Sequence, residues 1–254
     1  MSQLHHPEVR EQVSDEEWQA RVELAACYRL IALNRWDDLV FTHASTRVPG
    51  TEDHFLINPY GLLFEEVSAS NLVKVNQQAG KVLDSPYAVN PAGFIIHSAI
   101  HAARQDIHCV LHTHTTAGVA VSANRDGLLP ISQQAVVALS SIAYHDYEGI
   151  AVNESERSSL VADLGDKTHY ILRNNGLLTV GASVADAFLA MYNLQNACAI
   201  QVAALAGSQV VKVDPRIVDG MQTQAEKVTR GLGGQLVWPC LLRRLDRELP
   251  GYDC

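Results

Sequence analysis

The segment His112-Thr113-His114 has the residue types and the spacing of a metal-binding pair. Its surroundings, IHCVLHTHT at 107–115, predict a β-strand, in which side chains two residues apart lie on the same face. The two Cα atoms are then expected about 6.5–7 Å apart, which suits two ligands of one Zn²⁺ with bonds of about 2.0–2.1 Å. For this pair alone, hydrogen-bonded histidines on a solvated strand face are the competing interpretation.

Further histidines lie just before this pair. His97 and His101 are one turn apart in a segment that fits a helix, and His108 falls on the same strand face as His112. Five histidines therefore lie within 18 residues. Each could be a packed core residue when taken alone, but together they predict a histidine-lined site.

The elements that position these residues show no regular βαβ rhythm. A helix is expected at 15–36, where Ser14 can act as the N-cap, and another at 183–207, where Ser183 and Asp186 resemble a capping box. Strands are expected within 39–66, 167–174 and 176–181, a short helix leading into a strand within 68–75, and a more polar helical stretch at 214–249.

The composition narrows the class of protein. The chain has 254 residues, 47% of them hydrophobic, which is enough to bury a sizeable core. A net charge of −9 argues against nucleic acid as a partner, because phosphate binding needs a basic footprint. The five cysteines contain no CxxC pair, which indicates reduced thiols in a cytoplasmic protein. A signal peptide and an apolar run of the roughly 20 residues that cross a membrane are both absent from the sequence.

Four segments together resemble one known family. HSAIHAARQDIHCVLHTHTTAGVAVSA is similar to the metal-binding core of class II aldolase/adducin proteins, which include sugar-phosphate aldolases, epimerases and the head domain of adducins. The resemblance continues in the correct order over residues ~20–207, and it is carried by THASTRVPG, FLINPYGLLFEEVSASNLVKVN and YILRNNGLLTVGASVADAF.

The resemblance implies an α/β fold of three layers, α/β/α, with a mostly antiparallel central sheet. Together with the polar sequence of the N-terminus, which predicts a flexible arm at 1–14, it divides the chain into a class II aldolase/adducin-like domain at 15–207 and a C-terminal helical extension at 208–254. It also implies a homo-oligomer, expected to be a tetramer. An apolar stripe in the extension supports the oligomer unless it folds back on its own domain: Leu236, Val237, Trp238, Leu241 and Leu242.

The resemblance also assigns the metal and catalytic positions. The first two metal ligands fall on His112 and His114, and the third falls on Asn175, because NNG stands where NHG is usual. The catalytic glutamate falls on Gly93, which cannot move a proton. A divalent metal, with zinc as the expected ion, would therefore be held weakly or be absent, since an amide oxygen is a weaker zinc ligand than an imidazole.

The remaining family positions concern proton transfer and substrate binding. The proton-donating tyrosine of a neighbouring subunit falls on Tyr144, and His97 is a candidate for the missing acid/base, with His101, His108 and His145 as other candidates. The phosphate-contacting segment falls on His43, Ser45 and Arg47, of which Arg47 offers a fork of donors that suits an anion.

Two functions follow from this pattern. The first is a divergent metal-dependent lyase of the aldolase class, which cleaves or rearranges a small hydroxy-carbonyl substrate. The second is a catalytically inactive, adducin-like binding or scaffold protein, which the residues Gly93 and Asn175 favour. A third variant of the enzyme has a relocated base and acts on a non-phosphorylated acid.

Overall fold

The computed structural model describes residues 4–150, 155–207 and 209–254. A seven-stranded sheet in the order β3-β2-β1-β4-β7-β6-β5 forms its centre. All neighbouring strands are antiparallel except β5 and β6, so the expected mixed α/β fold with a mostly antiparallel sheet is confirmed. The strands are β1 (His43–Arg47), β2 (His54–Ile57), β3 (Val73–Asn76), β4 (Cys109–Thr113), β5 (Ile142–His145), β6 (His169–Leu172) and β7 (Gly176–Gly181).

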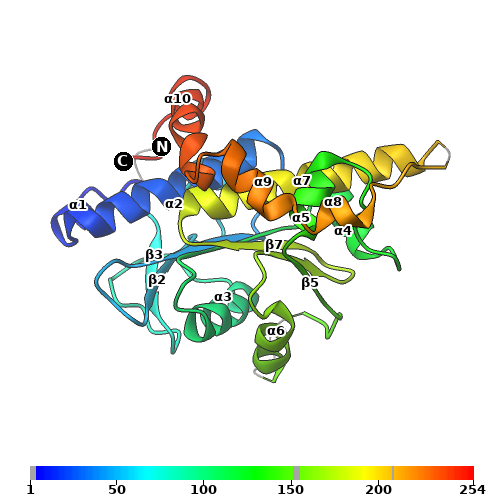
Figure 1. The fold of residues 1–254 in the computed structure, drawn as a ribbon. Coiled ribbons are helices and arrows are strands. Elements are labelled where there is room, and N and C mark those ends of the chain that lie inside the picture. Colours follow the sequence, from blue (N-terminus) through cyan, green and yellow to red (C-terminus); the bar gives the residue numbers. More distant parts are fainter. Residues whose placement is uncertain (1–3, 151–154, 208) are drawn as a thin grey trace.

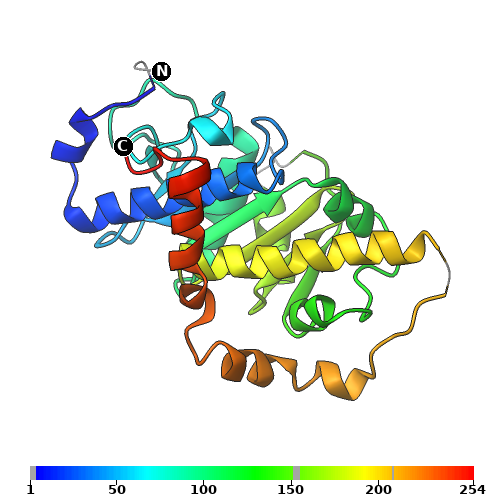
Figure 2. The same cartoon turned by 90° about the horizontal axis from the view of Figure 1, so that it is seen from above.

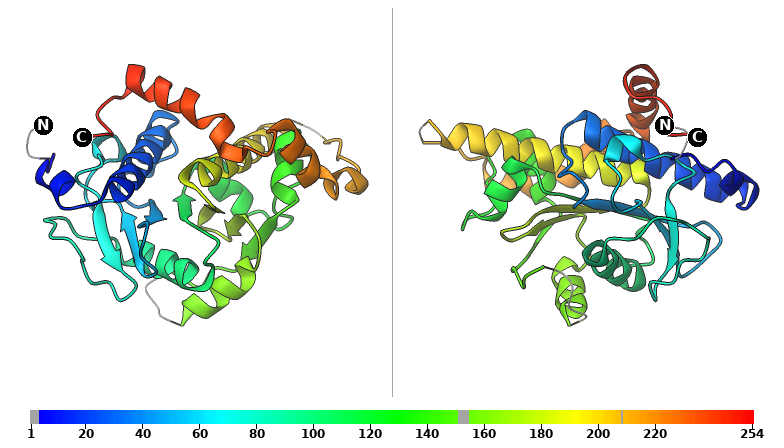
Figure 3. Two further views of the ribbon diagram at one scale, coloured as in Figure 1. Left: turned by 60° about the vertical axis from the view of Figure 1, so that its left-hand side comes forward. Right: turned by 180° about the vertical axis from the view of Figure 1, so that it is seen from behind.

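Helices cover both faces of this sheet, which gives three layers (Figure 1). One face carries α3 (Pro91–Ala103) and α6 (Glu156–Leu164), as the view from behind in Figure 3 also shows. The other face carries the long helices α2 (Asp15–Leu33) and α7 (Val184–Leu205). The shorter helices are α1 (Glu8–Glu11), α4 (Thr116–Ser122), α5 (Gln133–Leu139), α8 (Pro215–Val218), α9 (Met221–Val228) and α10 (Trp238–Glu248).

The two expected long helices begin where their capping residues predict. Ser14 Oγ accepts a hydrogen bond from Glu17 N at 3.2 Å, and Ser183 Oγ accepts one from Asp186 N at 3.1 Å. The helix expected within 68–75 is wrong, because the chain there forms turns and then β3. Asn71 stabilises these turns, since its side-chain oxygen accepts from Ser68 N and its amide donates to Glu66 O.

The C-terminal extension belongs to the main core. Helix α10 lies beside α2 (Figure 2), and its residues Trp238 and Leu245 are 4% and 0% exposed. The backbone beyond α10 is bound as well, because Tyr252 O accepts from Ala69 N at 2.8 Å. Much of the apolar stripe thus folds back on its own domain, which is the alternative to cover by a partner subunit. Leu236 alone of its members is a largely exposed residue, at 46%.

The described part of the N-terminal arm also contacts the domain. Leu4 O accepts a hydrogen bond from Asn71 Nδ2 at 3.2 Å, and His6 Nε2 lies 3.2 Å from Tyr87 Oη. Val9 of α1 is 6% exposed. No helix in the described ranges is long and apolar enough to cross a membrane.

Candidate functional site

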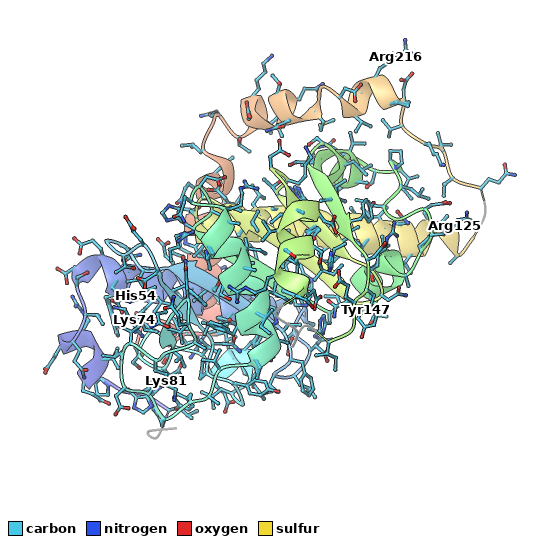
Figure 4. All side chains as sticks on the ribbon, turned by 90° about the horizontal axis from the view of Figure 1, so that it is seen from below. His54, Lys74, Lys81, Arg125, Tyr147 and Arg216 are labelled. Atoms are coloured by element: carbon cyan, nitrogen blue, oxygen red, sulfur yellow. The ribbon has the colours of Figure 1, made fainter. Side chains whose placement is uncertain are left out.

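A cavity of about 410 Å³ lies at one end of the central strands, on the face that carries α3 and α6. Strand ends from β1 and β4 form one wall, and β5, the loop after it and α6 form the opposite wall. Figure 4 looks onto this face and labels Tyr147, which lies on the loop after β5. The cavity is lined by His43, His112, His114, Asn175, His145 and Glu156, among others.

The predicted metal-binding pair converges in this cavity. His112 Nδ1 donates to Leu177 O at 2.9 Å, and His114 Nδ1 lies 3.1 Å from Asp38 Oδ2. These contacts leave both Nε2 atoms as acceptors, and the two atoms lie 2.8 Å apart. Two lone pairs this close repel each other unless a proton or a cation lies between them. Burial and the neighbouring imidazoles hold the pKa of His112 well below its usual value, which disfavours the proton.

Asn175 supplies an oxygen atom beside this pair. Its Oδ1 is buried without a hydrogen-bond partner, and the residue lines the cavity together with His112 and His114. A buried acceptor without a donor is costly, so an electropositive group is expected there. The carboxylate and carbonyl behind the two imidazoles orient them as outer partners do in metal sites. The donors therefore fit one divalent cation.

The fit is that of a weak site. Within the described residues, no group of three or more His, Cys, Asp or Glu side chains is arranged to hold a metal ion. The third donor would be the neutral amide of Asn175, which binds zinc less strongly than an imidazole. The donor set thus consists of two imidazole nitrogens and one amide oxygen.

His43 occupies the space of the side chain that Gly93 lacks. A Cβ atom placed on Gly93 would lie 2.6 Å from His43 Cδ2 and 2.8 Å from His43 Cγ. Glycine is therefore required at position 93 while histidine stands at position 43. The imidazole of His43 lines the cavity, whereas Gly93 does not.

Behind His43, a chain of buried hydrogen bonds runs along α3. His43 Nδ1 lies 2.7 Å from His97 Nε2, and Ser45 Oγ lies 2.5 Å from His97 Nδ1 and 2.8 Å from His101 Nε2. His101 Nδ1 ends the chain without a partner. Burial lowers the pKa of His101 to about 3 and holds the pKa values of His43 and His97 well below 6.5. These imidazoles are neutral at pH 7.

The three residues of the expected anion subsite lie in different surroundings. Ser45 lies behind His43, and Arg47 is turned away from the cavity, since neither lines it. The Arg47 guanidinium donates to four backbone carbonyls, those of Ile107 at 2.8 Å, Glu52 at 3.1 Å, Arg104 at 3.2 Å and His101. Its donors are thus committed to joining β1 to α3 and to the segment after α3. Of the three predicted substrate-binding residues, only His43 lines the cavity.

The two predicted catalytic residues also lie outside the cavity of their own chain. His97 is fully buried behind His43. Tyr144 points to the opposite face of β5, where its hydroxyl accepts from Leu128 N at 3.0 Å and Arg173 stacks on its ring at 4.4 Å. A role for Tyr144 thus depends on a neighbouring subunit and stays a prediction.

A second polar cluster forms the opposite wall. The sequence did not predict that its residues lie close together. His145 Nδ1 lies 2.8 Å from Asp163 Oδ2, while its Nε2 lies 3.7 Å from Glu156 Oε1 and 3.9 Å from Glu148 Oε1. His145 is 4% exposed, and its Nε2 has no hydrogen-bond partner. Burial raises the pKa of Glu156. His145 itself was among the candidate residues, but no short motif joins it to an aspartate 18 residues later.

Comparisons with known proteins show which chains are similar to this one. Over 249 residues, the chain is 56% identical to a Pseudomonas aeruginosa protein assigned by name to aldolase class 2, with 96% of both chains covered. It is 50% identical to alpha-adducin of Rattus norvegicus over 203 residues, which are 77% of this chain and 27% of that one. The structure of L-fuculose 1-phosphate aldolase from Glaciozyma antarctica superposes with a TM-score of 0.78, at 27% identity and 92% coverage of both chains.

A family model also matches most of the sequence. The model described as "Class II Aldolase and Adducin N-terminal domain" matches residues 22–202, which contain the whole sheet and all the histidines of the cavity. The chain belongs to the class II aldolase and adducin family.

Proposed function

We propose that the cavity binds a small hydroxy-carbonyl compound and that the chain catalyses its aldol cleavage or a related reaction with a divalent metal. His112, His114 and Asn175 would hold the cation, with zinc as the expected ion. Convergence of the two histidine Nε2 atoms, 2.8 Å apart and beside the unpartnered Asn175 Oδ1, carries this proposal.

A bound divalent cation would supply a Lewis acid that polarises the carbonyl group of the ligand. The chain must then supply a group that takes the proton from the ligand. We assign this role to His43 Nε2, because Nδ1 is engaged with His97 Nε2 and the ring lines the cavity. The lowered pKa of His43 keeps its imidazole neutral at pH 7, so that Nε2 carries a lone pair.

His97 would act through His43 as a positioning residue. For His43 Nε2 to carry a lone pair, His43 Nδ1 must hold the hydrogen and donate it to His97 Nε2. His97 Nδ1 then donates to Ser45 Oγ, which in turn donates to His101 Nε2. The chain of bonds thereby fixes both the ring orientation and the tautomer of His43.

Deuterium exchange into dihydroxyacetone tests this proposal without knowledge of the natural substrate. In D₂O with added Zn²⁺, the full chain is expected to exchange the carbon-bound hydrogens faster than Zn²⁺ alone, as followed by proton NMR. The variant His43→Ala should lower the enzymatic rate by about 10²–10⁴-fold, the usual contribution of a general base. His108→Ala removes an exposed histidine of the neighbouring segment and serves as the control.

A binding or scaffold protein without catalysis is the second candidate. Gly93 favours it, and so does the 50% identity to alpha-adducin, compared with 27% to the L-fuculose 1-phosphate aldolase. Exchange by the wild-type chain no faster than with Zn²⁺ alone would support this candidate and exclude the enzyme.

The same proposal includes a homo-oligomer, with a tetramer as the expected form, and a cytoplasmic location. Tyr144 does not reach the cavity of its own chain, so a neighbouring subunit would have to bring such a tyrosine to the cavity. Light scattering of the purified chain tests the oligomer, and a monomer at micromolar concentration would exclude it.

A further inference from the structure

The wall of the cavity formed by β5 and α6 presents hydrogen-bond acceptors, of which Glu148 Oε1 accepts from Ser159 Oγ at 2.7 Å and His145 Nε2 has no partner. His145 Nδ1 is engaged by Asp163 at 2.8 Å, which leaves Nε2 as the free atom of a ring that is 4% exposed. This Nε2 has no partner, and carboxylate oxygens of Glu156 and Glu148 lie 3.7 and 3.9 Å from it. Even when the imidazole carries a proton, one positive charge faces three carboxylates. This wall therefore favours groups that donate hydrogen bonds and disfavours anions.

Most charged side chains around the cavity are negative as well. Among the described lining residues, four are acidic (Asp38, Asp146, Glu148 and Glu156) and one, Arg173, carries a permanent positive charge. The Arg173 guanidinium stacks on Tyr144 and donates to Asn124 O at 2.7 Å. Arg47 is bound to backbone carbonyls outside the cavity. No built subsite for a phosphate or carboxylate group is found among these residues.

We infer that the cavity takes an uncharged polyhydroxylated hydroxy-carbonyl compound, such as a free ketose, and rejects the corresponding phosphate ester. The inference rests on the proposed function, which places the carbonyl end of the ligand at His112 and His114. Hydroxyl groups at the other end would donate to His145 Nε2, Glu148 and Glu156. A site built to receive hydroxyl donors discriminates strongly, because its buried acceptors stay unpaired when the donor is missing. A phosphate group offers only acceptors of negative charge in the same place.

Two matched pairs of compounds test the inference by isothermal titration calorimetry on the full chain with Zn²⁺ present. The pairs are L-fuculose with L-fuculose 1-phosphate, and dihydroxyacetone with dihydroxyacetone phosphate. In at least one pair the free compound is expected to bind at least tenfold more tightly than its phosphate. Equal or tighter binding of both phosphates would overturn the inference and leave the proposed function standing, whereas binding of none of the four compounds would overturn both.

Two variants locate the discrimination on this wall. The side chain of Glu148 is 44% exposed, so Glu148→Lys is expected to fold normally. This change should narrow the preference for the free compound at least tenfold, because an ammonium group replaces a carboxylate beside His145 Nε2. Glu226→Lys makes the same change in charge at an exposed position of α9 and should leave the preference unaltered. An equal effect of the two variants would show that net charge sets the preference, and would overturn the assignment to the β5–α6 wall.

Discussion

The two walls of the cavity differ in how firmly their polar groups are held. On the β1–β4 wall, His43, His97 and His112 are 2%, 0% and 2% exposed, and each has a hydrogen-bond partner at 2.5–2.9 Å. On the β5–α6 wall, His145 and Glu156 are 4% and 5% exposed, but the side chain of Glu148 is 44% exposed and lies 3.9 Å from the histidine it faces. The first wall is built into the core, whereas the second combines buried groups with a carboxylate that borders solvent.

This difference separates two tasks. Groups that must hold a proton or a cation in a fixed position need partners that lock their rotamers and tautomers, and burial provides them. Groups that recognise the far end of a ligand can adjust and can change with less effect on folding. Substitutions on the β1–β4 wall should therefore cost stability, and substitutions on the β5–α6 wall should change ligand preference.

Arg47→Ala should show the largest effect on stability. The change removes hydrogen bonds to four backbone carbonyls, two of them buried and two partly buried, and a hydrogen bond to a charged group contributes about 1.5–3 kcal/mol. We expect a loss of about 3 kcal/mol in the free energy of unfolding, measured by urea denaturation. Arg243→Ala, an exposed arginine of α10, should cost less than about 0.5 kcal/mol. A loss of less than about 0.5 kcal/mol for Arg47→Ala would contradict the structural role assigned to Arg47.

Gly93→Ala should cost slightly less, about 2 kcal/mol, because the added methyl group overlaps the ring of His43. The double variant with His43→Ala should recover at least about 1 kcal/mol of this loss, since it frees the occupied space. Urea denaturation of the four proteins in this cycle measures the coupling between the two positions. Additive effects would show that the residues at 43 and 93 do not share one space.

Acidification should lower the free energy of unfolding through the buried histidines behind the β1–β4 wall. Burial lowers the pKa of His101 to about 3, so this group binds a proton in the unfolded chain below pH 6.5 while the folded chain excludes it. Stability is therefore full above pH 6.5 and falls as the pH drops toward 3. His101 alone should remove about 2 kcal/mol between pH 6.5 and 5. His101→Gln should flatten the dependence of unfolding free energy on pH, and an unchanged slope would contradict the neutral state of His101.

Asn175→His should raise zinc affinity at least tenfold, or about 1.4 kcal/mol, because an imidazole replaces a weak amide donor. Titration with a competing zinc chelator measures this change. The same histidine placed at Asn174, an exposed neighbour in the turn, serves as the control. Zinc that stays in the unmodified chain through dialysis against chelator would mean that another residue completes the site.

The smallest effect on stability is expected for Glu148→Gln on the β5–α6 wall. Its half-exposed side chain accepts one hydrogen bond, from Ser159 Oγ at 2.7 Å, so the unfolding free energy should change by less than about 0.5 kcal/mol. Thermal unfolding measures this value. A loss of unfolding free energy as large as that expected for Gly93→Ala would show that the two walls do not differ in their contribution to stability.

The parts of the site that one strand or one turn determines could be predicted from the sequence. Alternation along 107–115 placed His112 and His114 near each other, and NNG in place of NHG drew attention to Asn175. The capping residues gave the starts of α2 and α7 because hydrogen bonds within one turn determine them.

Long-range geometry could not be predicted in this way. His43, Ser45 and Arg47 do share a strand face, but four residues of strand span about 13 Å, so only the first reaches the cavity. The cluster of His145 and Asp163 depends on the parallel pairing of β5 with β6 and on how α6 packs, and neither leaves a short motif. The position of α10 depends on which distant core residues Trp238 and Leu245 pack against, and no local sequence pattern shows this.

The contact between His43 and Gly93 also restricts the order in which substitutions can accumulate at these positions. A larger side chain at position 93 meets the imidazole of His43, so it is expected to enter more easily after position 43 has accepted a smaller residue. The order of the two substitutions therefore matters, and the pair is expected to show epistasis.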